Sequence, residues 1–124
     1  SNQVVALFAE AQAMLMECGF QPETAMDALK KIFLGNAQHV AQVGPIKALT
    51  GPVQRGDVST VAKHLSVLEK PKDRLLYLLL SERLMEVAQK GKADYQEKAM
   101  RELLEDSYSQ LLTEEYSRLK GERN

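Results

Sequence analysis

The chain has 124 residues, of which 44% are apolar, and this is enough to bury one modest hydrophobic core. Sixteen basic and seventeen acidic residues leave a formal net charge of -1, so no overall positive field attracts nucleic acid or an anionic membrane. A chain of this length favours one domain, 1–124. The longest aliphatic run, Leu75 to Leu80, is far shorter than the roughly 20 apolar residues of a membrane span, which favours a cytoplasmic protein.

Apolar residues recur at helical spacing over 4–18, and Gly19 supplies the residue that ends such a helix. Cys18, the only cysteine, falls on the expected inner side of this helix beside Leu15. A lone thiol in this place is typical of a small buried side chain, so we expect Cys18 in the interior.

A second helix is expected to begin at Pro22, because proline suits a first helical turn. Gly35 is expected to stop it, since glycine is a poor residue for a helix interior. A shorter helical stretch then covers 36–43 and ends at Gly44-Pro45.

The segment Gly44–Asp57 concentrates three glycines and two prolines between helical patterns. Glycine permits backbone conformations that side chains forbid, and proline fixes its own φ, so we expect a shaped loop. Asp57 is a good N-cap for the helix that follows, which finishes near Lys70-Pro71.

Asp73 is the expected cap of the next helix, whose apolar residues over 75–88 cover nearly its whole circumference. Such a helix belongs at the centre of the core. A last helix starts near Asp94, and its apolar stripe over 103–119 extends beyond what a compact domain needs. The fold is therefore predicted to be all-α, with five to six helices and an extended C-terminal helix.

Several kinds of site are excluded by the residues present. His39 and His64 are the only histidines and Cys18 is alone, so we expect no zinc site and no other metal site. The chain has no glycine-rich sequence that cradles phosphates, so no nucleotide cofactor is expected to bind to this chain alone.

Polar residues of the loop and the helix after it form the candidate site. If Asp57 caps that helix, Thr60 and His64 project from one face at i, i+4, with Arg55 beside them. An arginine can bind a carboxylate or phosphate bidentately, and a histidine can exchange a proton near neutral pH. The competing interpretation is local: Asp57 and Thr60 form a cap, Arg55 pairs with Asp57, and His64 donates to the backbone.

The pattern Gly-Pro-x-x-Ala-Leu-Thr-Gly-Pro-Val-x-Arg-Gly-Asp, followed by Thr60 and His64-Leu65, resembles a known family. The family comprises Rossmann-like, short-subunit dehydrogenase-like oxidoreductases. Their C-terminal half is a domain of unknown function (2520) that is similar to the C-terminal domain of phosphogluconate dehydrogenase. The resemblance covers roughly 1–91 and leaves 92–124 as a helical extension. It implies an N-terminal Rossmann domain that binds NAD(P) and is absent from this chain, which would be inactive alone.

The resemblance also implies roles for individual residues and a partner. Asn2 and His64 would be catalytic, orienting the reacting carbonyl or imine of a small-molecule substrate. Related dehydrogenases dimerise through this helical domain, so a homodimer is implied as well. The substrate-binding residues implied are Thr50, Gly51, Pro52, Arg55 and Asp57, with Arg55 binding an anionic group.

A non-catalytic helical interaction module is the alternative function. Its motivation is the C-terminal stripe through Tyr108, Leu112, Tyr116 and Leu119, because a long helix needs a surface to cover its apolar side. Sedimentation at several concentrations separates a self-pairing module from a monomer.

Overall fold

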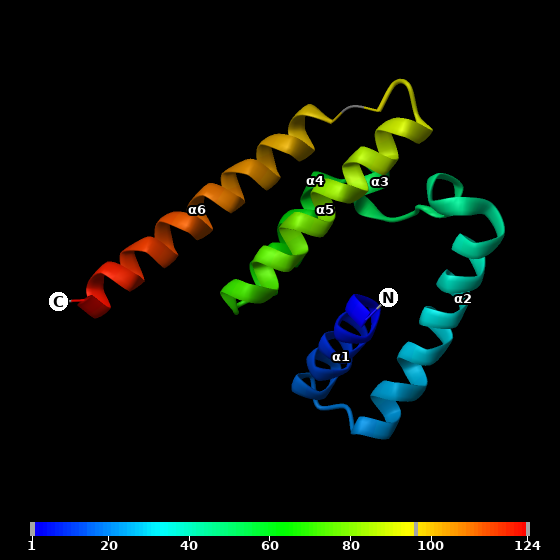
Figure 1. Ribbon diagram of the computed structural model, residues 1–124, viewed down its shortest axis with the longest axis horizontal. Coiled ribbons are helices and arrows are strands. Elements are labelled where there is room, and N and C mark those ends of the chain that lie inside the picture. Colours follow the sequence, from blue (N-terminus) through cyan, green and yellow to red (C-terminus); the bar gives the residue numbers. More distant parts are fainter. Residues whose placement is uncertain (1, 96, 124) are drawn as a thin grey trace. The chain divides into compact units, whose positions relative to one another are not determined.

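A computed structural model describes residues 2–95 and 97–123, and the regular structure found there is helical, without strands (Figure 1). This confirms the all-α prediction and the long C-terminal helix. The chain divides into two compact units, an N-terminal unit of residues 1–44 and a C-terminal unit of residues 45–124. The helices are α1 (Asn2–Glu17), α2 (Pro22–Ala48), α3 (Pro52–Arg55), α4 (Val58–Val67), α5 (Pro71–Gly91) and α6 (Lys98–Arg123).

The N-terminal unit is a helical hairpin in which α1 packs on α2. The rings of Phe8 and Phe33 meet edge to face with their centroids 5.5 Å apart. Gly19 ends α1 with φ 99°, as predicted, and its amide donates to the Met16 carbonyl while that of Phe20 donates to the Leu15 carbonyl. These two bonds satisfy carbonyls that a helix end leaves free.

Cys18 is exposed, so the prediction of a buried thiol was wrong. The residue follows the last residue of α1, where the chain turns out of the helix. Leu15, one turn earlier, is half-buried. Helical periodicity predicts a face only while the helix continues, and Cys18 lies just beyond its end.

Gly35 does not end the second helix, which continues through 36–43, so the predicted stop and the separate short helix were both wrong. One glycine costs a helix only about 1 kcal/mol relative to alanine, and the good helix formers around it outweigh that. The break comes instead at Gly44, whose φ of 82° and ψ of 168° are not helical. The next residue is Pro45, which has no backbone N–H to donate to the preceding helical turn and so cannot continue that helix.

In the C-terminal unit, α5 and α6 lie side by side (Figure 1) and enclose a core with α3 and α4. Side chains from all four helices form one buried cluster, so the long α6 is part of the core and not an appendage to it. The cluster consists of Val53, Val61, Leu65, Leu78, Met85, Met100, Leu104 and Leu111.

The expectation that α5 lies at the centre of the core was wrong, because only one of its faces is buried. Leu78 and Met85 point into the cluster. The opposite face carries four exposed leucines, which are Leu76, Leu79, Leu80 and Leu84. The sequence has leucine on both faces of this helix, and leucine content alone does not distinguish a covered face from an open one.

The helix boundaries in this unit differ from prediction in three places. The helix after Asp57 ends at Val67, before the expected Lys70-Pro71. Lys70 is the N-cap of α5, so Asp73 lies in the first helical turn and the prediction that it caps the helix was wrong. In that turn the Asp73 carboxylate still interacts favourably with the positive end of the helix dipole. The last helix begins at Lys98, one turn later than expected.

The predicted stripe on α6 is divided between the core and the surface. Leu104 and Leu111 are buried and Tyr108 packs against the cluster, whereas Leu112 and Tyr116 are exposed. Within the described residues, no helix combines the length and the apolar character needed to cross a membrane.

Candidate functional site

The segment Gly44–Asp57 is built around its three glycines. Gly44, Gly51 and Gly56 have φ values of 82°, 101° and 70°, in the range that glycine tolerates and other residues rarely adopt. The segment is less open than the predicted loop, because residues 45–48 are helical and α3 adds another turn. Proline begins each turn, which explains why both are helical.

Arg55 is the last residue of α3, and the end of that helix fixes where it lies. Gly56 adopts the left-handed conformation and donates to the Val53 carbonyl at 3.1 Å, while the Asp57 amide donates to the Pro52 carbonyl at 2.8 Å. The chain therefore turns sharply after Arg55, whose side chain is 58% exposed.

Asp57 caps α4, as predicted. Its carboxylate accepts from the Thr60 hydroxyl at 2.7 Å, from the Thr60 amide at 3.1 Å and from the Ser59 hydroxyl at 3.0 Å. These hydrogen bonds lower the pKa of Asp57 below its usual value, and the bond from the Thr60 side chain has the largest effect. The positive charge of Arg55 lowers the pKa further. The carboxylate is therefore ionised at neutral pH.

The local interpretation of these residues is supported in part. The Arg55 guanidinium lies 3.8 Å from the Asp57 carboxylate, and both side chains are partly solvated. Such an exposed ion pair contributes little to stability, so Arg55 can exchange this partner for another anion at small cost. The cap role of Asp57 is observed, whereas its role in binding substrate stays a prediction.

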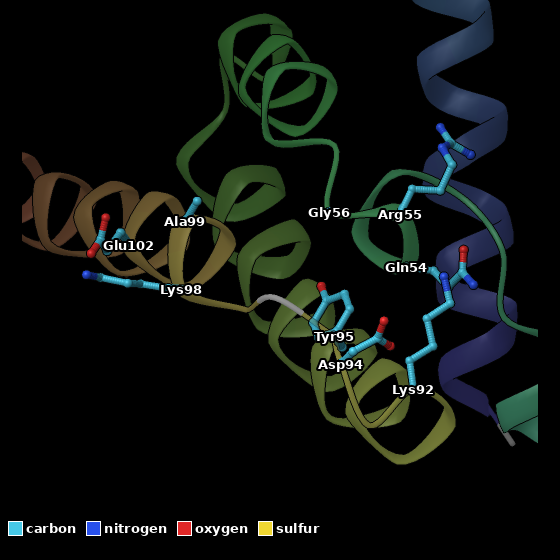
Figure 2. A pocket seen from close by; sticks show the side chains of 9 residues that line it. All are labelled: Gln54, Arg55, Gly56, Lys92, Asp94, Tyr95, Lys98, Ala99 and Glu102. Carbon is cyan, nitrogen blue, oxygen red and sulfur yellow. The ribbon is translucent and has the colours of Figure 1, made fainter.

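A cavity of about 660 Å³ adjoins Arg55 (Figure 2). Its walls come from α3, from the connection between α5 and α6, and from the first turns of α6. The residues that line the cavity include three cationic side chains, Arg55, Lys92 and Lys98, and two anionic ones, Asp94 and Glu102. In Figure 2 the Arg55 side chain points away from Tyr95, which also lines the cavity. The sequence did not predict that Lys92 and Lys98 line the cavity with Arg55. The two lysines lie at least 37 residues after Arg55 and belong to no recognisable motif.

Tyr95 ties the connection between α5 and α6 to α3. Its hydroxyl donates to the Val53 carbonyl at 2.5 Å, across 42 residues of sequence. Burial, and to a lesser degree the charge of Glu97, raises the pKa of Tyr95, so the phenol keeps its proton. One wall of the cavity is thus held by a hydrogen bond from a single side chain.

His64 lies on α4, where its partner is a side chain of α5 and not the backbone. Its Nδ1 is 2.8 Å from the Tyr77 hydroxyl oxygen, and the two rings meet edge to face at 5.8 Å. Burial raises the pKa of Tyr77, and a hydrogen bond with the Ser81 side chain opposes that rise. The sequence gives no local signal for the pair of His64 and Tyr77, because the two residues lie 13 positions apart on different helices.

The remaining predicted residues are not all brought together. Gly51 is the N-cap of α3 and Pro52 its first residue, so both shape the turn that presents Arg55. Thr50 is exposed just before them. Asn2 begins α1 and belongs to the N-terminal unit, so its role beside the others stays a prediction. Among the described residues, no group of three or more His, Cys, Asp or Glu side chains could hold a metal ion.

Comparison with protein families gives a match over residues 1–84 to the family described as "Domain of unknown function (DUF2520)". No curated protein and no solved structure matches the chain. The match includes the whole glycine and proline segment, α4, and most of α5, whereas Lys92 and Lys98 lie outside it. Because it covers well over half of the sequence, the chain belongs to the family of domains of unknown function designated DUF2520.

Proposed function

We propose that this chain is the helical substrate-binding domain of an NAD(P)-dependent oxidoreductase, active only together with a Rossmann domain that binds the cofactor. The observation that carries the proposal is the turn at Arg55. Gly51 and Gly56 shape it, and the cap at Asp57 anchors it, so an exposed arginine is held beside a cavity. The family resemblance of the sequence supports the oxidoreductase setting.

The charges of the cavity favour a substrate with an anionic group. Three cations against two anions leave an excess of one positive charge among its lining residues. Arginine binds carboxylate and phosphate through two parallel hydrogen bonds, which gives orientation as well as affinity. Arg55 therefore anchors the substrate. His64 is not among the residues that line the cavity, and the family resemblance alone gives it the role of orienting the carbonyl or imine that receives the hydride.

The test joins this chain to the Rossmann domain of a family member and measures oxidation of NADPH and NADH with small carbonyl compounds and imines that carry a carboxylate or phosphate. Arg55→Ala is expected to lower kcat/KM about 10- to 100-fold, the loss of a hydrogen bond to a charged group. Arg55→Lys restores part of it, because the charge remains but the bidentate geometry does not.

Arg83→Ala is the matched control, because Arg83 is an exposed arginine of α5 whose partner, Glu86, lies on the same helix. It should leave kcat/KM unchanged. Full activity in an Arg55→Ala, His64→Ala double variant would remove both residues from the proposed mechanism.

Self-association is the second proposed function, and the exposed leucine face of α5 favours it. Leu76, Leu79, Leu80 and Leu84 are 38–45% exposed on the side of the helix away from the core. Adjacent exposed leucines along one face are typical of a surface that a partner covers. The proposed partner is a second copy of the chain, as the resemblance to dimeric dehydrogenases implies.

Sedimentation velocity at several protein concentrations tests this dimer. Leu80→Glu is expected to yield monomers, because an unpaired carboxylate would be buried at the centre of the interface. Val67→Glu, at an exposed apolar residue of α4, is the matched control and should leave the dimer intact. A chain that remains monomeric at every concentration contradicts the proposal.

A further inference from the structure

Two side chains, one on α4 and one on α5, meet at the surface of the C-terminal unit. His64 is exposed near the end of α4, and Tyr77 is half-buried on α5. The Tyr77 hydroxyl oxygen lies 2.8 Å from Nδ1 of His64, and the two rings meet edge to face. The exposed imidazole of His64 is therefore held by a phenol from the other helix.

The direction of this hydrogen bond follows from the chemistry of the two groups. A phenol has one hydrogen to donate, and a neutral imidazole has one ring nitrogen that accepts. That nitrogen is a stronger base than a phenol oxygen, and a phenol O–H is a stronger acid than an imidazole N–H. In its contact with neutral His64, the Tyr77 hydroxyl therefore donates to Nδ1.

We propose that Tyr77 is a positioning residue for His64, whose hydroxyl donates to Nδ1 and so holds the imidazole in the tautomer with its proton on Nε2. Since the bond that one ring nitrogen makes determines which nitrogen carries the proton, the neutral His64 presents an N–H donor at Nε2.

The consequence for chemistry rests on the proposed function. A neutral imidazole that donates from Nε2 matches an acceptor oxygen or nitrogen, such as the carbonyl or imine that receives a hydride. It does not act as the base in that state, because its free lone pair on Nδ1 is already engaged. His64 would therefore polarise and orient the acceptor atom, and Tyr77 would act only through His64.

Nitrogen NMR of the 124-residue chain labelled with ¹⁵N-histidine tests the tautomer directly, without any substrate or cofactor. The chain has two histidines, and His39→Gln assigns the signals. In buffer near pH 9, where a histidine side chain is ordinarily neutral, Nε2 of His64 should resonate as a protonated nitrogen and Nδ1 as an unprotonated acceptor. In Tyr77→Phe, the Nδ1 signal should shift towards that of the exposed His39.

Tyr108→Phe is the matched control, because it removes the hydroxyl of another half-buried tyrosine packed on the same core. It should leave the His64 signals in place. The tautomer of His64 in the unaltered chain tests the proposal by itself if Tyr77→Phe folds poorly. A protonated Nδ1 in the unaltered chain, or His64 signals that do not respond to Tyr77→Phe, would overturn the proposal. Because this measurement needs no turnover, an inactive joined enzyme would contradict the proposed function alone.

Discussion

Leu104→Ala is expected to lower the free energy of unfolding by about 2 to 5 kcal/mol, the range for a leucine truncated inside a packed core. Leu104 is 1% exposed on α6 and belongs to the same cluster as Val61 and Leu78. Alanine removes the contacts of the leucine side chain and leaves a cavity that two long helices cannot close fully. Urea unfolding followed by helical circular dichroism measures the loss, since the chain has no tryptophan.

Leu112→Ala is the matched control on the same helix. Leu112 is 51% exposed, so the same truncation there should cost less than about 1 kcal/mol. Equal losses at the two positions would mean that α6 does not pack as described. The comparison matters because the family match ends at residue 84, before α6 begins. A large loss at Leu104 would show that the C-terminal unit depends on a helix outside the matched region.

The local signals at Gly19, at Asp57 and in the glycine-rich segment predicted local structure correctly, whereas the cap expected at Asp73 did not form. Gly19 ends α1 and Asp57 caps α4 because a helix end needs only one residue with the right backbone freedom or the right acceptor. The glycines of the Gly44–Asp57 segment adopt the conformations that only they tolerate. Each of these effects is determined by a few neighbouring residues, so a single sequence is enough to find them.

Predictions that depend on competition between neighbours, or on distant contacts, failed or were missing. Gly35 weakens its helix but cannot outweigh the residues around it. The Tyr77 hydroxyl binds His64 across 13 residues, and Tyr95 binds Val53 across 42. Both contacts arise only when helices pack. The cavity wall at Lys92 has the same origin, so the sequence indicated Arg55 as a candidate but not the lysines that line the same cavity.

Gly51→Ala is expected to lower the free energy of unfolding by about 1 to 3 kcal/mol, because its backbone conformation is open almost only to glycine. Gly51 has φ 101° and ψ -175° as the N-cap of α3. An added Cβ meets no atom within 4 Å, so the cost comes from the backbone and not from crowding. The same change should reduce kcat/KM in the joined enzyme, since a backbone that relaxes at Gly51 displaces the turn that presents Arg55.

Gly35→Ala separates this backbone effect from the general effect of replacing glycine. Gly35 also has no atom within 4 Å of an added Cβ, but it lies inside α2 without a positive φ. Alanine there should stabilise the chain by about 0.5 to 1 kcal/mol, because it restricts the unfolded state and favours the helix. Opposite signs at the two glycines, measured by the same urea unfolding, would locate the strain at Gly51. A Gly51→Ala variant as stable as the unaltered chain would mean that the turn can be built without its glycine, and the argument that a rigid turn presents Arg55 would fail with it.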